Sequence, residues 1–179
     1  MGKQYLPGMT FKFLEYFNKF NFKDKICLEI GSGDSTIYWS YHFKKVISYE
    51  HDLEWIKKIK KEYETIQRYN IKLIHYDKDI FINEKFKKNI SEADCIIIDN
   101  DPYFIKRDEF CFFTKLYRKK DSLIVLDNGT WNLHAYDYMQ RNFFSKDFPG
   151  AEFKNENNKK TVTTLFFEEK TKDYYFTSK

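Results

Sequence analysis

The chain is poor in cysteine, with three in 179 residues, at positions 27, 95 and 111. The three are far apart in the sequence, form no Cys-x-x-Cys pair and lie inside apolar runs. Zinc sites need closely spaced cysteine ligands, so this spacing argues against one. The pattern instead predicts reduced thiols in the core of a cytoplasmic protein.

Long hydrophobic runs and a strong excess of one charge are also absent. No apolar segment approaches the length of a membrane span, and the N-terminus lacks the apolar core of a signal peptide. Basic residues number 31 and acidic residues 27, so the net charge of +4 is small and dispersed. We therefore expect neither a membrane nor a nucleic acid as partner. The oligomeric state stays open, with a homodimer among the alternatives.

The residues that are present suffice for one core. Hydrophobic residues make up 42% and aromatic residues 20% of the chain, which favours a single α/β domain at this length. Residues 1–24 read as an N-terminal helical extension, in which Thr10 is predicted to cap a helix with apolar residues at helical spacing. Residues 25–169 form the predicted domain, and residues 170–179 form a tail.

A glycine-containing turn follows the first predicted strand, in the sequence Ile26-Cys-Leu-Glu-Ile-Gly-Ser-Gly-Asp-Ser-Thr36. An apolar run that passes into Gly-x-Gly is typical of a strand, a tight turn and the start of a helix. A dinucleotide fingerprint needs a third glycine where Thr36 stands, so the NAD interpretation is weakened. The acid-x-Gly-x-Gly pattern instead resembles class I S-adenosylmethionine-dependent methyltransferases. Ser35 stands where that family often has a third glycine. The resemblance implies S-adenosylmethionine as cofactor and a cofactor loop made of Glu29, Gly31, Ser32, Gly33, Ser35 and Thr36.

A second acid is placed where the ribose of such a cofactor would bind. Glu50 ends the predicted strand 45–50, and it follows Gly33 by 17 positions. This places it at the carboxyl end of a neighbouring parallel strand, where α/β sheets bind ligands. A carboxylate accepts the two hydrogen bonds that a ribose offers. We expect His51 and Asp52 to follow at the adenine edge, with a cap for the next helix as the alternative role of Asp52.

The strands that follow complete the predicted sheet. Strand 71–76 ends at Asp77, which resembles the family's acceptor for the adenine amino group, although Asp79 or an ordinary loop role are alternatives. Strands 93–99 and 122–127 alternate with helices, as in parallel sheets. After a helix over 136–144 and a break at Phe148-Pro-Gly150, segments 151–154 and 161–168 read as an antiparallel hairpin. The predicted fold class is α/β: a doubly wound, mostly parallel seven-stranded sheet with a C-terminal antiparallel hairpin, the Rossmann-like methyltransferase fold.

Acids at two strand ends suggest the chemistry. Asp99 ends the fourth strand, and Asp127-Asn128 ends the fifth. The pattern resembles divalent-metal-dependent O-methyltransferases typified by catechol O-methyltransferase, which implies that Asp99, Asp127 and Asn128 hold Mg²⁺ or Mn²⁺. Oxygen ligands suit these ions, and coordination favours loss of a hydroxyl proton. Asp-Asn-Gly is also a common turn, so an ordinary structural role is the alternative.

The catalytic lysine of the catechol enzymes is not matched, but Lys106 and Arg107 come a little later and His134 is another candidate base. Together with Asp99 and Asp127, Lys106 and His134 make up the candidate catalytic set. Asp99 is also a predicted cofactor-binding residue. Asn100-Asp-Pro-Tyr103 approaches the Asn/Asp-Pro-Pro-Tyr motif of amino methyltransferases, although Asp101 breaks it.

We therefore expect a methyltransferase that acts on a hydroxyl of a small polar molecule or glycan precursor, with metal assistance as an option. Amino methylation through Asn100–Tyr103 is the second hypothesis. A catalytically silent methyltransferase fold that serves as an interaction module is the third.

Overall fold

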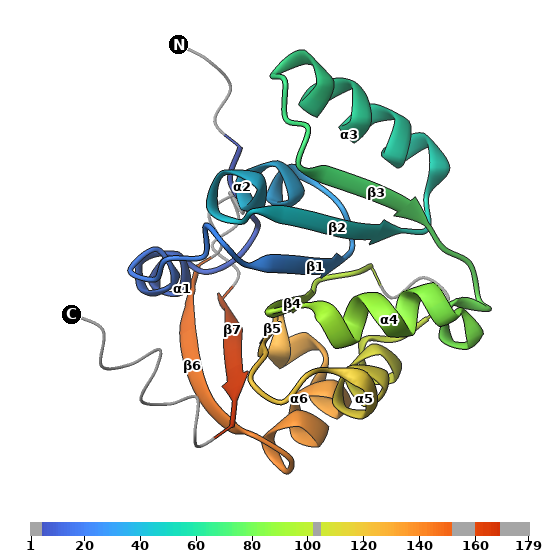
Figure 1. Cartoon of the computed structure of the whole chain (residues 1–179). Helices are drawn as coiled ribbons and strands as arrows, with labels where there is room; N and C mark the ends of the chain where they lie inside the picture. The colour runs from blue at the N-terminus through green and yellow to red at the C-terminus, as the bar shows by residue number, and fades with distance from the viewer. Residues whose placement is uncertain (1–4, 102–104, 152–159, 169–179) are drawn as a thin grey trace.

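The computed structural model describes residues 5–101, 105–151 and 160–168. A seven-stranded sheet in the order β3-β2-β1-β4-β5-β7-β6 runs through them (Figure 1). The first five strands are parallel, and β7 runs antiparallel to both β5 and β6. This confirms the predicted fold class. The strands are β1 Ile26–Ile30, β2 Lys45–Glu50, β3 Ile71–His75, β4 Cys95–Ile98, β5 Leu123–Leu126, β6 Phe144–Ala151 and β7 Lys160–Phe167.

Helices cover both faces of the sheet because the central strands are apolar on both sides. One core layer packs helices α1 and α2, with side chains of α3, against the face that contains Cys27, Val46 and Ile97. The other layer packs α4, α5 and α6 against the face that contains Leu28, Ile96 and Ile98 (Figure 1). The α-helices are α1 Phe11–Phe17, α2 Asp34–His42, α3 Leu53–Thr65, α4 Glu84–Glu92, α5 Arg107–Tyr117 and α6 Leu133–Gln140, and short 3₁₀ turns are η1 Ile80–Ile82 and η2 Gly129–Trp131.

The order of the strands reverses at β1, which pairs with β2 on one side and β4 on the other. A reversal of this kind opens a crevice at the carboxyl ends of the strands, because the connections on either side run to opposite faces. The ends of β1, β2 and β4 therefore lie at the same edge of the sheet. The glycine turn, Glu50 and Asp99 follow these three strand ends.

The C-terminal hairpin differs from the prediction in its first strand. Strand β6 runs through Phe148-Pro-Gly150, with Pro149 opposite Val162 and Gly150 opposite Thr161. It begins at Phe144, which was predicted to end a helix. Because β6 is an edge strand, Pro149 can sit in it without breaking a ladder on both sides. Most of the predicted strand 151–154 lies outside the described residues.

Several helix boundaries also differ. Helix α5 begins at Arg107 and α6 at Leu133, whereas starts at 104 and 136 were predicted; residue 104 itself lies outside the described ranges. Helix α4 was not predicted, although Phe86 and Ile90 are buried on one face of it.

Two predicted local features are confirmed, the cap at Asp52 and the burial of the cysteines. Asp52 caps α3 by accepting hydrogen bonds from Glu54 and Trp55. The three cysteines are buried and free.

Within the described part of the chain, no helix combines the length and apolar character needed to cross a membrane.

Candidate active site

The two glycines of the turn have different roles. Gly31 has a φ of +94°, and a Cβ there would lie 2.5 Å from the carbonyl oxygen of Asp99. The close approach of β4 therefore requires glycine at this position. Gly33 is extended, and a Cβ there would make only ordinary contacts with Ser35, at 3.7 Å from Oγ and 4.0 Å from the amide nitrogen. Gly33 borders the cavity described below, so its missing side chain leaves room there.

Glu29 lies behind the turn and is fully buried. Its carboxylate accepts hydrogen bonds from Ser35 Oγ at 2.6 Å, Thr36 Oγ1 at 2.5 Å, Ser48 Oγ at 2.7 Å and Trp39 Nε1 at 3.1 Å. Burial raises the pKa of Glu29 to about 7, against the opposing effect of the hydroxyl donors. The contacts tie the first turn of α2 to β1 and β2. Glu29 and Thr36 thus shape the loop from behind and are not among the residues that line the cavity.

A cavity of about 450 Å³ opens at the carboxyl ends of β1, β2 and β4. Seven of the predicted cofactor residues line it: Gly31, Ser32, Gly33, Ser35, Glu50, His51 and Asp99. Asp52, which was also predicted at the adenine edge, lines the cavity too. The other lining residues were not predicted as cofactor residues, and they are Leu6, Gly8, Asp34, Trp55 and Asp101. The crevice at the strand reversal therefore holds most of the predicted cofactor residues.

Glu50 is fixed in one orientation at the cavity wall. Its Oε2 accepts a hydrogen bond from the Ser32 amide at 2.9 Å. Its Oε1 accepts from the amides of His51 at 2.8 Å and Asp52 at 3.0 Å, and His51 Nδ1 lies 2.8 Å from the same oxygen. Each carboxylate oxygen has two lone pairs, so Oε2 retains acceptor capacity toward the cavity.

Trp55 lines the cavity, although the sequence did not lead us to predict it there. Its indole Nε1 donates a hydrogen bond to the Ser32 carbonyl at 2.6 Å, which joins α3 to the glycine turn. Lys58 Nζ lies 4.2 Å from the centre of its ring. The sequence signal that could have identified Trp55 as a site residue is its position three residues after the helix cap Asp52. Leu6 and Gly8 offered no comparable signal, because only the fold brings the N-terminal segment to this edge.

Three other predicted residues lie outside this cavity. Asp77 lines a neighbouring hollow beyond β3, together with Asp79, whose amide donates to Asp77 Oδ1 at 3.0 Å. Lys106 and His134 line a different hollow of about 360 Å³, together with Trp131. That hollow lies between the N-terminal ends of α5 and α6. Arg107 also lines it.

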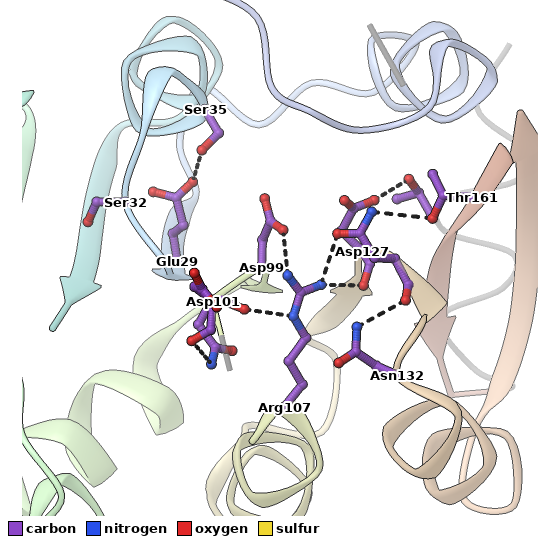
Figure 2. A network of polar contacts seen from close by, with 12 residues as sticks. Glu29, Ser32, Ser35, Asp99, Asp101, Arg107, Asp127, Asn132 and Thr161 are labelled. Carbon is purple, nitrogen blue, oxygen red and sulfur yellow. Dashed lines mark hydrogen bonds and ion pairs between the residues drawn. The ribbon is translucent and has the colours of Figure 1, made fainter. Parts of the chain in front are cut away.

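The three predicted metal ligands are brought together, but around an arginine. Arg107 donates from Nη2 to Asp99 Oδ1 at 3.1 Å and from Nη1 to the Asp127 carbonyl and Asn128 Oδ1 (Figure 2). Asp127 Oδ1 accepts from Thr163 Oγ1 at 2.5 Å, and Asp127 and Asn128 are buried. A fixed guanidinium among these oxygens would repel a divalent cation, so the residues do not fit a metal ion as they stand. The described ranges likewise contain no group of three His, Cys, Asp or Glu side chains placed to hold one.

The amino-methyltransferase motif is visible only in part. Asn100 is fully buried, and its Nδ2 donates to the carbonyls of Ile105 at 3.0 Å and Asp101 at 3.3 Å. Its own carbonyl accepts from Arg107 Nε at 2.8 Å. Residues 102–104 lie outside the described ranges. Asn100 therefore turns its amide group into the protein, whereas Asp101, the other described residue of the motif, lines the cavity.

Comparison with solved structures identifies the fold of the chain. No family model matches the sequence, and no curated protein matches it significantly. Among solved structures, precorrin-6y C5,15-methyltransferase from Geobacter metallireducens matches with a TM-score of 0.64 at 13% identity, over 86% of each chain. The O-methyltransferase TomG from Streptomyces achromogenes, solved with S-adenosylmethionine, matches with a TM-score of 0.63 at 12% identity, over 88% of this chain and 77% of TomG. The chain has the fold of class I S-adenosylmethionine-dependent methyltransferases.

This fold also occurs in a solved structure that is named for a different reaction. Spermidine synthase from Thermotoga maritima matches with a TM-score of 0.59 at 18% identity, over 79% of this chain and 53% of that one. The fold alone therefore does not fix the reaction, which has to be argued from the site.

Proposed function

We propose that the chain is an S-adenosylmethionine-dependent methyltransferase that methylates a hydroxyl group of a small polar molecule or glycan precursor. The observation that carries the proposal is the position of Glu50. Three backbone amides fix its carboxylate at the wall of a 450 Å³ cavity, beside the glycine turn. A ribose with two adjacent hydroxyls matches a carboxylate held in this way.

The acidic wall of the cavity supports a positively charged cofactor. Its charged lining residues are Asp34, Glu50, Asp52, Asp99 and Asp101, and no lysine or arginine is among the described residues that line it. S-adenosylmethionine carries a sulfonium and an ammonium group, and both are favoured by nearby carboxylates. We assign the ribose to Glu50 and the positively charged end to the region of Asp99.

The acceptor has a separate place in this proposal. We assign it to the hollow of Lys106, Trp131 and His134, which Arg107 also lines, and Arg107 contacts Asp99 at the cavity wall. In the transfer, the acceptor oxygen bonds to the methyl carbon as the carbon–sulfur bond breaks, and that electron pair stays on sulfur. The hydroxyl proton passes to a base, for which we propose His134. No metal ion takes part in this scheme, because the predicted ligands are held by Arg107.

The first prediction concerns cofactor affinity. Replacing Glu50 by Ala should weaken binding of S-adenosylmethionine at least tenfold, since the ribose loses a charged acceptor worth about 1.5–3 kcal/mol. Isothermal titration calorimetry measures this directly. Glu54→Ala is the matched control, because Glu54 is an exposed glutamate four positions further along the chain. Full affinity in the Glu50 variant would refute the ribose assignment.

The two alternatives are separated by further measurements. A silent interaction module should give no binding heat with S-adenosylmethionine or S-adenosylhomocysteine. A methyl-transfer screen with hydroxylated sugars, phenols and amines distinguishes oxygen from nitrogen acceptors. Methylation of amines alone would favour the amino-methyltransferase alternative over the proposed one.

A further inference from the structure

Two hollows follow one another along the seam between α5 and α6. The first, of about 360 Å³, contains Lys106, Trp131 and His134 and is the proposed acceptor site, here called the acceptor hollow. The second, of about 480 Å³, is here called the aromatic hollow, and it is lined by Asp108, Glu109, Phe112, Phe113, His134 and Tyr138. Because Asp108 and His134 line both, the two hollows are adjacent.

The spacing of residues on the two helices explains this arrangement. Asp108 and Phe112 are four positions apart on α5, and so are His134 and Tyr138 on α6. Residues at this spacing lie on the same face of a helix. The two helices pack against each other, and the ring centres of Phe112 and Tyr138 are 6.2 Å apart (Figure 1). The seam therefore changes from polar side chains at the helix starts to aromatic side chains one turn further on.

Trp131 gives the acceptor hollow an exposed aromatic residue on a fixed turn. It is 52% exposed. Its amide donates to the Asn128 carbonyl at 2.9 Å, and the same carbonyl accepts from Asn132 Nδ2 at 3.0 Å, which holds the backbone of η2 in place. A sugar ring has faces of carbon-bound hydrogens, which pack on an indole, and hydroxyls at its rim. Asp108 and His134 line the same hollow and can hydrogen-bond to such hydroxyls.

The charges of the two hollows favour a neutral ligand. In the acceptor hollow, Arg107 is paired with Asp99, and Lys106 and Asp108 carry opposite charges. The aromatic hollow is acidic: Asp108 and Glu109 line it, and no lysine or arginine is among the described residues that do so. A phosphate or carboxylate group would be repelled there.

We propose that the acceptor is a neutral glycoside, with its sugar ring against Trp131 in the acceptor hollow and an apolar aglycone in the aromatic hollow. The inference rests on the proposed function and narrows its acceptor class. The sugar supplies the hydroxyl that is methylated. The aglycone takes no part in the transfer, but it adds affinity because Phe112 and Tyr138 remove its apolar surface from water.

The test compares two series of glycosides. Ligand-observed NMR titrations use protein saturated with S-adenosylhomocysteine, with 4-nitrophenyl pyranosides and methyl pyranosides of glucose, galactose, mannose, N-acetylglucosamine, fucose and rhamnose. At least one 4-nitrophenyl pyranoside should bind, with a Kd about tenfold below that of its methyl counterpart, since only its aryl group buries apolar area in the aromatic hollow. With S-adenosylmethionine, the same pyranoside should be methylated on its sugar, and 4-nitrophenol should not be methylated.

Variants assign the two parts of the ligand to the two hollows. Trp131→Ala should weaken binding of both series about tenfold, whereas Trp131→Phe, which keeps an aromatic face, should retain most of it. Phe112→Ala should weaken only the 4-nitrophenyl series. Two controls should change neither series: Tyr69→Ala removes an 80% exposed aromatic from the turn before β3, and Leu116→Ala lies on α5 one turn beyond Phe112 and lines neither hollow. Unchanged affinity for S-adenosylmethionine shows that each variant is folded.

Several outcomes would overturn the inference: no binding of any 4-nitrophenyl pyranoside, equal affinity for the two series in the wild type, equal losses in both series from Phe112→Ala, or methylation of 4-nitrophenol in place of the sugar. A wild type that binds no S-adenosylmethionine would instead defeat the proposed function. A protein that binds S-adenosylmethionine but no pyranoside would defeat only this inference, because the proposed function also includes other small polar acceptors.

Discussion

At the scale of single residues, the ionisation of Glu29 should affect how the free energy of unfolding depends on pH. Burial raises its pKa from 4.5 to about 7 in the folded protein. Between these values the folded state binds a proton that the unfolded chain has released. A state that binds more protons is disfavoured as pH rises, so this group lowers the free energy of unfolding between about pH 4.5 and pH 7.

We predict that Glu29→Gln flattens this pH dependence. Relative to the variant, the wild type should lose roughly 3 kcal/mol of stability from pH 4.5 to pH 8, as a shift of about two to three pKa units requires. Urea unfolding at several pH values measures the difference. Glu54→Gln, on the exposed side of α3, should leave the slope unchanged. Equal slopes in the wild type and Glu29→Gln would contradict the prediction.

The sequence predicts the positions of some site residues and not of others. Glu50 and Gly31 belong to a local strand–turn–helix pattern, so their places follow from spacing along the chain. Arg107 carries no such pattern. It follows Lys106, and only the pairing of β4 with β5 decides which of the two cations is buried.

At the scale of elements, Thr10 joins the start of α1 to the C-terminal hairpin. Its hydroxyl donates to the Phe148 carbonyl at 2.9 Å, and its amide donates to Thr163 Oγ1 at 3.1 Å. Thr163 in turn donates to Asp127 at the end of β5. As the sequence predicts, Thr10 precedes the helix, but its side chain bonds to β6 and makes no capping bond.

Replacing Thr10 by Val should therefore destabilise the protein by about 1–3 kcal/mol, because a buried carbonyl loses its hydroxyl donor while the side-chain volume is kept. Thermal or urea unfolding gives the value. Thr65→Val is the comparison, since the Thr65 hydroxyl bonds to the Lys61 carbonyl on an exposed helix surface. Similar small effects in both variants would argue against a buried bridge between α1 and β6.

The elements of the hairpin show why local signals failed there. Pro149 and Gly150 disfavour a strand taken by themselves, and Phe144 fits the helical spacing that precedes it. The strand forms because β7 pairs with it along its whole length, from Phe144 opposite Phe167 to Ala151 opposite Lys160. Tertiary pairing outweighed local propensity.

For the whole molecule, the parallel half was predictable because buried parallel strands are continuous apolar runs, as in Ile96-Ile97-Ile98. Their polar ends then had to converge at one edge. The division of that edge into separate hollows was not predictable, since it depends on which side chains fill the spaces between strand ends. Asp77 follows β3, while Lys106 and His134 lie at the starts of α5 and α6. Asp77 lines one hollow outside the cavity, and Lys106 and His134 line another.

The position of Trp55 also gives the protein a built-in optical probe. The chain has three tryptophans: Trp39 is fully buried beside Glu29, Trp55 lines the large cavity, and Trp131 lines the hollow of Lys106 and His134. Indole emission depends on polarity and on nearby quenchers. In a Trp131→Phe variant, Trp55 still reports on a compound that enters the cavity. In a Trp55→Phe variant, Trp131 still reports on a compound that enters the hollow of Lys106 and His134. Comparing the two variants would thus show, without any added label, where a given compound binds.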